Sequence, residues 1–415
     1  MALQDQETVA HDVGIHDFGL CAASERAPWF DIAGGFVRRV LARLERGRLV
    51  VEMPDGRRIG RNAPEPGPDA VIVLHDWRCV RRVLKGGDVG FAEGYMAGEW
   101  TSPDLTALIE LLALNTDALK GSWAGSRPVR LLARLWHITH SNTRKGSRRN
   151  ISFHYDLGNE FYETWLDRGM QYSSAIYEAG DDLEAAQNRK LTRVVENLDI
   201  EGGERVLEIG CGWGAVAERL SVAHGCHVTG LTLSQRQLDY AQDRLDNLGL
   251  KSDMRLQDYR DCEGTFDRVV SIEMIEAVGE KYWSHYFELL RHRLKEGGRA
   301  VIQAITIEDK RFETYRFETD FIQRYIFPGG MLPSRAALER EINAAGLKLI
   351  GAETFGDSYA KTLADWRARF EASWSRVEGM GFDQRFRRMW EYYLCYCEAG
   401  FRAGTIDVGL YTIGR

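Results

Sequence analysis

From about residue 200 onward, short apolar runs alternate with segments in which apolar residues recur at helical spacing. The short runs predict strands and read "ERVLEIG", "HVTGLTLS", "MRLQDY", "FDRVVSI", "RAVIQAITI", "LKLIGAETF" and "TIDVGLYTIG". The segments between them predict helices, two of which end at Gly225 and Gly249. The alternation predicts an α/β fold with a doubly wound, mostly parallel sheet, which binds ligands at the carboxyl ends of its strands.

The first hundred residues follow a different pattern. "GFVRRVLARLERGRLVVEMPDGRRIG" predicts a helix and then a hairpin that turns at Asp55-Gly56. A strand and a helix follow, with Gly86-Gly87 expected to end that helix, and "LTALIELLALN" predicts another helix. A chain of 415 residues is long enough for two domains. We expect a flexible tail at 1–27, a small α+β domain at 28–125, a basic linker at 126–150 and the larger domain at 151–415.

Composition and charge exclude several classes of protein. The chain is 44% hydrophobic and 28% charged, as ordinary globular proteins are, and its net charge of −7 gives no bias toward nucleic acid. Its seven cysteines include no CxxC pair, so we expect a reducing cytoplasm, no disulfide framework and no metal site. The polar N-terminus is unlike a signal peptide, and no apolar run reaches the ~18 residues of a membrane-spanning helix.

One stretch, between Asp117 and Asp156, contains no acidic residue. Its basic residues are Lys120, Arg127, Arg130, Arg134, Arg144, Lys145, Arg148 and Arg149. Within it, "PVRLLARLWHI" alternates basic and apolar residues at helical spacing. The segment is either a solvated linker helix or a peripheral membrane contact, because each basic residue gains about 1 kcal/mol near anionic lipid. The pattern favours neither.

A glycine-rich loop joins the first strand of the larger domain to its first helix. Gly210, Gly212 and Gly214 have the spacing GxGxG, not the GxGxxG of dinucleotide sites, and no P-loop lysine follows. The glycines either leave room for a ligand against bare backbone or only allow a tight turn. Glu208, just before them, suits a cationic or amino-bearing ligand.

The next two strand ends favour S-adenosylmethionine over NAD as that ligand. The second strand ends in Thr232-Leu233-Ser234 without an acid, although Gln237 can still bind ribose hydroxyls. The third ends in "LQDY", where Asp258 can accept from an adenine amino group and Tyr259 can form an aromatic wall. We therefore expect a class I S-adenosylmethionine-dependent methyltransferase, a Rossmann-like fold with a seven-stranded, mostly parallel sheet.

Longer motifs resemble the cyclopropane-fatty-acyl-phospholipid synthase family of S-adenosylmethionine-dependent enzymes. They occur in the family's order and read "HYDLGNEFYETWLDRGMQYSSAIY", "LEIGCGWG", "GLTLSQRQ", "SIEMIEAVG", "YIFPGGMLPS" and "WEYYLCYCEAGFRAG". "VRRVLKGGDVGFAEGYMAGEW" is similar to the small N-terminal domain of the bacterial members, so the resemblance covers about residues 30 to 415. It implies that the small domain grips a membrane or a lipid substrate and that the catalytic domain carries acyl-pocket insertions.

The resemblance also implies which residues bind the cofactor. Tyr155, Tyr172 and Ser173 would close over it, and Gly210 and Gly212 would flank its methionine end. Ribose would be held by Thr232 and Gln237, and adenine by Asp258 and Tyr259. The full implied set is Tyr155, Tyr172, Ser173, Gly210, Gly212, Thr232, Leu233, Gln237, Gln257, Asp258 and Tyr259.

In the family, methyl transfer to a cis double bond gives a carbocation, and a bound bicarbonate removes a proton to close the ring. The match to the bicarbonate site is partial. Glu276 and Tyr359 stand at the family's acid and tyrosine positions, and Ile305 supplies a backbone group. Ser174 and Gln303 stand where the family has cysteine and histidine. Both can hydrogen-bond an anion, but the cationic imidazole is missing.

Several functions therefore stay open. Cyclopropanation of unsaturated phospholipid acyl chains with bicarbonate as base is favoured, and the alternative is a C-methyltransferase that makes methyl- or methylene-branched lipids, including furan precursors. A non-catalytic lipid-binding module and an N-methyltransferase for a soluble amine fit less well. The implied partners are unsaturated phospholipid and an anionic membrane surface, with a homodimer as an option and no nucleic acid. The implied location is cytoplasmic, at the inner face of the membrane.

Overall fold

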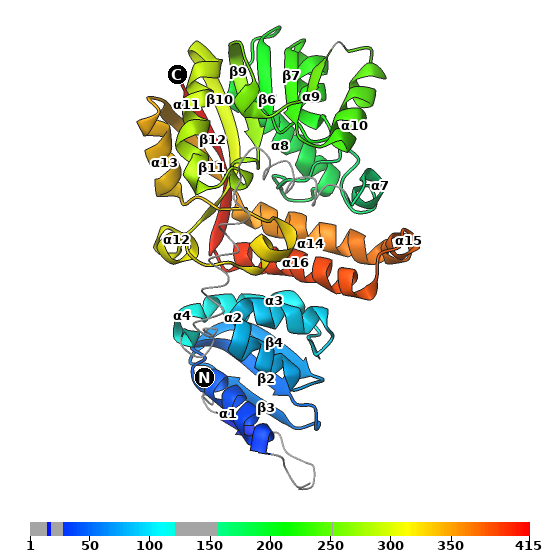
Figure 1. The fold of residues 1–415 in the computed structure, drawn as a ribbon, viewed down its shortest axis with the longest axis vertical. Coiled ribbons are helices and arrows are strands. Elements are labelled where there is room, and N and C mark those ends of the chain that lie inside the picture. The colour runs from blue at the N-terminus through cyan, green and yellow to red at the C-terminus, as the bar shows by residue number, and fades with distance from the viewer. Residues whose placement is uncertain (1–14, 18–27, 121–156, 251) are drawn as a thin grey trace, which may run out of the picture. The chain divides into compact units, whose positions relative to one another are not determined.

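The computed structural model describes residues 15–17, 28–120, 157–250 and 252–415. Tyr155 and the basic stretch after Lys120 lie outside the described residues. The chain forms two compact units, coloured along the chain in Figure 1. Unit 1 comprises Met1–Val129 and Arg388–Ala403, and unit 2 comprises Arg130–Arg387 and Gly404–Arg415. The segment Arg388–Ala403, which the sequence assigned to the catalytic domain, thus belongs to unit 1.

Unit 1 is an α+β unit built on a five-stranded sheet of order β1-β3-β2-β4-β5. Its strands are β1 Ile15–Asp17, β2 Arg46–Glu52, β3 Arg58–Asn62, β4 Glu65–Leu74 and β5 Trp100–Thr101. Its helices are α1 Pro28–Ala42, α2 Arg78–Met96, α3 Leu105–Leu114 and α4 Thr116–Leu119. Strands β2 and β3 form the expected antiparallel hairpin, with Gly56 at a φ of 81° in its turn. β1 lies within the expected tail and pairs with β3.

Helix α2 is interrupted at the glycine pair where the sequence expects a helix to end. Two helical stretches meet in a kink at Gly87, whose φ of 61° and ψ of −134° are not helical, and the second stretch continues to Met96. Gly86 has open space around the position of a side chain, whereas a Cβ on Gly90 would collide with the carbonyl oxygen of Arg82. The kink therefore folds the second half of α2 closely against the first half.

The C-terminal segment completes unit 1 through helix α16 (Gln384–Arg402). The Tyr95 hydroxyl donates to Glu391 Oε2 at 2.8 Å, and the Thr106 hydroxyl donates to Glu398 Oε2 at 3.1 Å. Glu398 is fully buried and pairs with Arg402 at 2.6 Å. A buried carboxylate without such partners would be strongly destabilising. Residues nearly 300 positions apart thus depend on each other.

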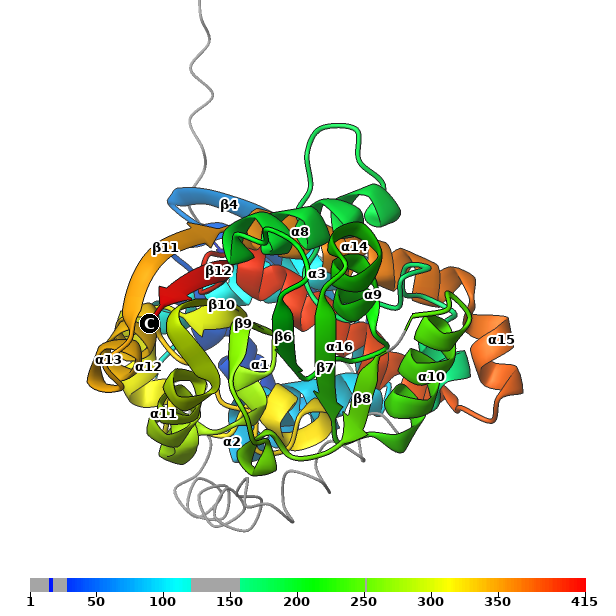
Figure 2. The ribbon, with the colours of Figure 1, turned by 90° about the horizontal axis from the view of Figure 1, so that it is seen from above.

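Unit 2 confirms the seven-stranded, mostly parallel sheet, with the order β11-β12-β10-β9-β6-β7-β8 (Figure 2). The strands are β6 Arg205–Ile209, β7 His227–Thr232, β8 Asp253–Leu256, β9 Phe266–Ile272, β10 Leu294–Ile307, β11 Lys348–Thr354 and β12 Ile406–Gly414. The last strand, β12, runs antiparallel between β10 and β11. All other pairings in this sheet are parallel.

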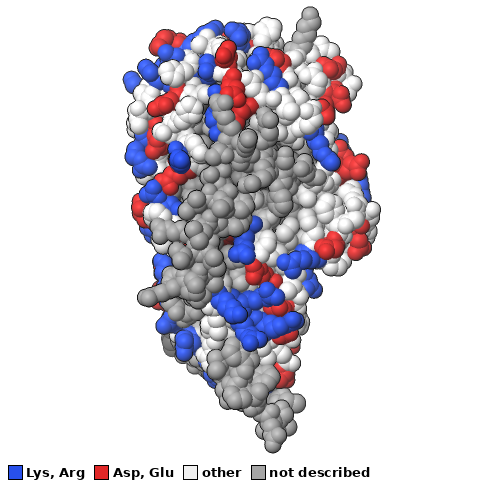
Figure 3. Space-filling model, viewed as in Figure 1, with Lys and Arg blue, Asp and Glu red and all other residues white. Residues whose placement is uncertain are grey.

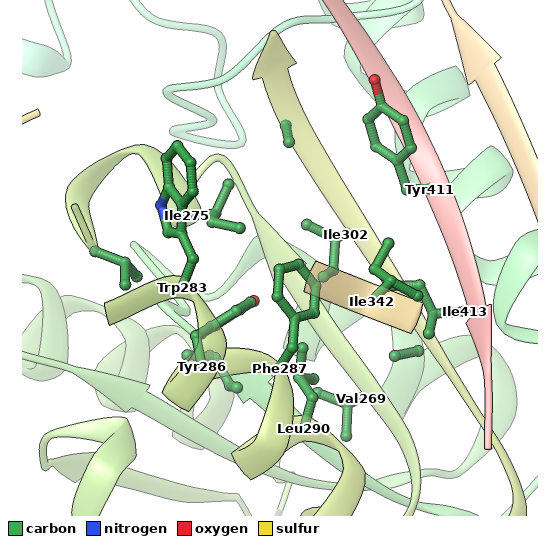
Figure 4. Packing of buried hydrophobic residues seen from close by; sticks show 14 of the residues in the cluster. Val269, Ile275, Trp283, Tyr286, Phe287, Leu290, Ile302, Ile342, Tyr411 and Ile413 are labelled. Carbon is green, nitrogen blue, oxygen red and sulfur yellow. The ribbon is translucent and has the colours of Figure 1, made fainter. Parts of the chain in front are cut away.

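Neighbouring residues on the strands of unit 2 face opposite cores, as the strand periodicity of two requires. Leu207, Val269 and Ile302 pack in one cluster with Trp283 and Phe287 of α11, and Figure 4 labels all of these except Leu207. Val206, Val270 and Val301 pack on the other face, against α8 and α9. The helices are α7 Asn159–Tyr162, α8 Leu183–Leu198, α9 Ala215–His224, α10 Gln235–Asp246, α11 Trp283–Arg293, α12 Asp309–Tyr315, α13 Arg335–Ala344, α14 Gly356–Ala372 and α15 Trp374–Gly379. Both faces are covered, so the sheet is doubly wound.

Two insertions interrupt the alternation of strands and helices. The first follows β10 and contains α12 and the short π-helix Ile322–Ile326. The second lies between β11 and β12 and contains α14, α15 and α16. Among the described helices, none combines the length and the apolar character that crossing a membrane requires.

Candidate active site

The glycine loop after β6 both turns tightly and leaves space. The N–H groups of Gly210 and Cys211 donate to Leu231 O, each at 2.9 Å, which ties the loop to the neighbouring strand. The three glycines have φ values of 81°, 52° and 85°. A Cβ on Gly210 or Gly214 would lie 3.1 Å from Met274 or Ala241, whereas one on Gly212 would meet nothing within 4 Å. Gly212 therefore borders open space at the carboxyl end of the first parallel strand, where ligands bind in such sheets.

The polar residues at the end of β7 are buried and bonded to each other. The Thr232 hydroxyl donates to Gln237 Oε1 at 2.9 Å and accepts from the backbone N–H of Ser234 at 3.1 Å. Leu233 lies between them in the chain. This leaves the Gln237 NH2 group as the donor of the pair. The structure thus brings the residues expected to bind ribose together and orients their amide.

At the end of β8, Asp258 is engaged by a cation. Arg260 donates to both carboxylate oxygens, at 2.8 and 2.6 Å, and both side chains are buried. Gln257 donates to Asp261 O at 2.8 Å, and the Tyr259 ring packs edge-on against Tyr286. Any adenine amino group that binds Asp258 would therefore share this carboxylate with Arg260.

The segment 171–175 forms another wall of the site and is anchored by α8 and α14. Gln187 Nε2 donates to Ser173 O at 2.9 Å, and Lys190 Nζ donates to Ser173 Oγ at 2.8 Å. The backbone N–H of Ala175 donates to the Thr362 hydroxyl at 3.1 Å. Tyr172 is not fully buried, and its ring lies 5.3 Å from that of Trp366. Two of the residues expected to close over the cofactor, Tyr172 and Ser173, thus lie in a segment that contacts α8 and α14, while Tyr155 lies outside the described residues.

The centre of the site is Glu273, a residue that the sequence reasoning missed. Its Oε1 accepts from the Ser174 backbone N–H at 2.8 Å and from Gln303 Nε2 at 2.7 Å. Its Oε2 accepts from the Tyr359 hydroxyl at 2.7 Å. Three residues expected to hold bicarbonate therefore converge, but on a carboxylate of the chain itself. The Ser174 side chain does not take part, since its hydroxyl donates to Ala175 O.

Glu276 lies one turn further along and is in a different electrostatic state. Its Oε1 accepts from the Ile305 backbone N–H at 2.6 Å, while its buried Oε2 has no partner among the described residues. Burial, with the charge of Glu273 adding to it, raises the pKa of Glu276 to about 8. Burial also raises the pKa of Glu273, but the donors from Ser174, Tyr359 and Gln303 oppose this shift. At neutral pH, Glu276 therefore fits the protonated form, whereas the three donors on Glu273 favour the ionised form of that carboxyl group.

Two further charged groups are buried close by. Burial raises the pKa of Glu208 to about 8, against a hydrogen bond from the Ala217 backbone, and its Oε2 has no partner among the described residues. Burial lowers the pKa of Lys190 to about 8, opposed by Glu273, Asp167 and Glu208. Glu208 Oε2 is thus a buried acceptor without a donor among the described residues, and a cationic or amino-bearing ligand at this site would supply the donor that it lacks.

The sequence contains a signal for Glu273, but that signal alone does not identify Glu273 as a residue of the site. "SIEMIEAVG" contains two acids three residues apart, and only Glu276 matched the expected position. Glu273 has a φ of 47°, in the left-handed region that few residues other than glycine adopt. This backbone conformation, which follows the end of β9, places its carboxylate among the donors.

Known proteins resemble this chain over most of its length. The model of the family described as mycolic acid cyclopropane synthetase matches residues 142–410. The tuberculostearic acid methyltransferase UfaA1 of Mycobacterium tuberculosis is 39% identical over 92% of this chain and 91% of its own. The cyclopropane-fatty-acyl-phospholipid synthase of Escherichia coli strain K12 is 35% identical over 79% of this chain and 83% of its own.

A solved structure agrees with the fold of unit 2. The mycolic acid cyclopropane synthase CmaA1, complexed with SAH and CTAB, superposes with a TM-score of 0.60 at 29% identity, covering 65% of this chain and 98% of that one. The residues present fit S-adenosylmethionine, since an orphaned buried Glu208 oxygen and the open space at Gly212 meet a ligand with a sulfonium and an ammonium group. The chain belongs to the mycolic acid cyclopropane synthetase family and is an S-adenosylmethionine-dependent methyltransferase.

Proposed function

We propose that the chain methylates the cis double bond of an unsaturated phospholipid acyl chain to give a methyl- or methylene-branched product. In this proposal Glu273 replaces bicarbonate as the proton acceptor. Bound S-adenosylmethionine supplies an electrophilic methyl group. The observation that carries the proposal is the convergence of the Ser174 N–H, the Gln303 amide and the Tyr359 hydroxyl on Glu273. A free anion would have to displace that carboxylate to reach the same donors.

Glu273 has the chemistry that this role needs. Oε1 already accepts two hydrogen bonds, so the remaining lone pair of Oε2 is the free acceptor for a proton. A fixed carboxylate in a water-poor site also stabilises a developing carbocation. Neighbouring Glu276, with its pKa near 8, stays neutral and does not compete for the proton.

Two relatives support different products. UfaA1 is named a tuberculostearic acid methyltransferase, and its match over nearly the whole chain supports a branched product. The Escherichia coli relative is named a cyclopropane synthase, and the retained contact between Glu276 and the Ile305 N–H favours ring closure as the second candidate. Both products need a proton acceptor, so Glu273 serves either reaction.

The test uses purified protein, methyl-deuterated S-adenosylmethionine and vesicles of a dioleoyl phospholipid. A branched product gains one labelled carbon and still takes up hydrogen on mild catalytic hydrogenation, whereas a cyclopropane gains the label and takes up none. We expect the hydrogenated product. A ring without residual double bond would establish the second candidate, and unlabelled lipid would overturn both.

Glu273 itself is tested by removing its carboxylate in two ways. Glu273→Gln keeps the shape but not the base, so kcat should fall at least ~100-fold, as the loss of a general base typically causes. Glu273→Gly relieves the left-handed backbone and frees the three donors. Wild-type activity should not change in bicarbonate-free buffer, whereas the glycine variant should require added bicarbonate. A bicarbonate requirement in the wild type would contradict the role of Glu273.

Unit 1 is proposed to bring the enzyme to an anionic membrane surface at the cytoplasmic face. Lys and Arg side chains gather on the face of unit 1 seen in Figure 3. Separately, the sequence of α2 contains Arg78, Arg81, Arg82 and Lys85, of which Arg78 and Arg82 pair with Asp76 and Glu99. Such clusters attract anionic lipid. A homodimer remains a prediction.

A further inference from the structure

Unit 1 encloses an apolar cavity that the proposed reaction does not use. It measures about 60 Å³ and lies between the sheet and the helices α1, α2 and α3. This is several times the about 10–15 Å³ that admits one water molecule, and well below the about 150 Å³ of an engineered cavity that binds benzene. Folded domains contain few voids of this size, because the groups that line a void lose packing contacts. The cavity is therefore sized for a narrow ligand.

The lining of the cavity selects against water and polar ligands. Every described residue that lines it is hydrophobic, Cys79 included. Burial raises the pKa of the Cys79 thiol to about 12, so this group stays neutral. The indole N–H of Trp100 donates to Phe91 O at 2.9 Å and is therefore already used. Apolar cavities stay dry, so hydrocarbon is the chemistry that fits this space.

The walls of the cavity are held too firmly to collapse into it. Trp100 is fully buried, and its ring stacks on that of Phe91 with the centroids 4.1 Å apart. A Cβ on Gly94 would lie 3.0 Å from the indole, so α2 packs on Trp100 as closely as a glycine allows. On the side of the sheet, Val51 of β2 pairs in register with Ile72 of β4. A void whose surroundings cannot relax stays open, so the space is preformed.

The cavity comes nearest to solvent between α1 and α3. Among the described residues that line it, Phe36 of α1 and Leu112 of α3 are half-buried, and the others are buried. Ala113 and Leu114 follow Leu112 and are half-buried as well, so apolar surface continues outward from this point. A chain that entered here would keep an apolar environment along the part that does not fit inside.

We infer that this cavity binds the methyl end of an alkyl chain, from a membrane phospholipid or from a free fatty acid. The chain end fills the void, and the next methylene groups run out between α1 and α3. Binding restores the packing contacts that the empty cavity lacks. The site thus adds a specific lipid contact to the charge-based attraction proposed for unit 1. The inference rests on that proposed role of unit 1, but not on the reaction at Glu273 or its product.

Trp100 can report whether the cavity is occupied, because bromine quenches tryptophan fluorescence on contact and is close in size to a methyl group. The probes are hexadecanoate brominated at its terminal carbon, added as a monomer, and vesicles of a phosphatidylcholine that carries the same chain. We expect saturable quenching of the full-length protein by at least one probe, and the probe that acts identifies the source of the chain. Hexadecanoate brominated beside its carboxylate should quench less. Trp100→Phe should lose the saturable quenching.

Filling the cavity provides the second test. Val37→Leu combined with Val80→Leu adds a methylene group from α1 and another from α2. Denying burial to about two methylene groups of the ligand weakens binding about 10-fold, and we expect that loss in the quenching titration. The exposed Val222→Leu on α9 is the matched control and should leave the titration unchanged. Leu108→Phe fills the same space from α3 and replaces the double variant should that variant not fold.

Wild-type fluorescence that neither probe quenches would overturn the inference. So would a double variant that unfolds at a higher temperature but is quenched as strongly as the wild type, because the cavity would then be a packing void only. The quenching titration and the lipid methylation assay fail separately. Quenching without methylation would reject only the proposed reaction, and methylation without quenching would reject only the cavity as a lipid site.

Discussion

Glu273 keeps a backbone conformation that costs an L-residue about 1–2 kcal/mol relative to glycine. The strain is offset by three hydrogen bonds to its carboxylate, each from a different part of unit 2. Strain of this kind concentrates at functional sites, where the surrounding structure holds it. Glu273 is therefore better explained by what its carboxylate does than by the stability of the turn.

The raised pKa of Glu276 predicts how the stability of the fold depends on pH. Because this pKa of about 8 lies above the ordinary value, the protonated side chain makes its full contribution to the free energy of unfolding below about pH 4.5. That contribution is lost as the pH rises through 8. Glu276→Gln resembles the neutral acid at every pH. The free energy of unfolding, measured with urea, should therefore fall less between pH 6 and pH 8.5 in Glu276→Gln than in the wild type.

The exposed Glu288→Gln on α11 is the control for this measurement and should follow the wild type at both pH values. Glu208 is present in the wild type and in both variants, and its raised pKa changes the pH dependence of stability in the same direction in each of them. Its effect therefore cancels when the three proteins are compared. An identical pH dependence in wild type and Glu276→Gln would contradict the neutral state of Glu276.

The sequence predicted part of the site residue by residue. The glycine loop follows from its local motif, whereas Gln303 and Tyr359 were expected only from the family resemblance, and the structure brings these two together on Glu273. Glu273 and Lys190 do not follow, because "EMIE" and "NRKL" read like ordinary solvent-facing segments. Their burial depends on how the segment 171–175 packs between α8 and α14, which is a tertiary property.

At the scale of elements, the strands and helices of unit 2 follow from periodicity and from glycine stops. In unit 1 the Gly86-Gly87 pair interrupts α2 as expected, but a second helical stretch follows the kink directly, which the sequence did not indicate. Whether a helix continues past such a pair depends on whether its second half finds a surface to pack on.

The kink in α2 predicts that Gly86 and Gly90 differ sharply in how well each tolerates substitution by alanine. Gly90→Ala would drive a methyl group into the Arg82 carbonyl and should lower the unfolding free energy by about 2 kcal/mol or more. Gly86→Ala meets open space in a helical position and should change it by at most about 1 kcal/mol, in the stabilising direction. Chemical denaturation of both variants checks this, and equal losses would contradict the close packing at the kink.

At the scale of the whole molecule, unit 1 consists of two segments that are distant in sequence. Residues 1–129 alone would lack the partners of Tyr95 and Thr106 and would expose the apolar surface on which α16 packs. We expect this fragment to show no cooperative thermal transition by circular dichroism. The same fragment with residues 388–403 attached through a flexible linker should unfold cooperatively. A cooperative transition of the shorter fragment would show that α16 is dispensable for unit 1.

The placement of α16 has a consequence for synthesis on the ribosome. Domains generally fold as units in the order in which they are made, at roughly 5–20 residues per second. The first segment of unit 1 leaves the ribosome early but waits for residues 388–403, on the order of 10–50 s later. The sheet of unit 2 waits equally for β12, which inserts between two strands made before it. Neither unit can finish folding before residues 388–414 have been made, so the nascent chain must stay soluble with both cores open until that segment has left the ribosome.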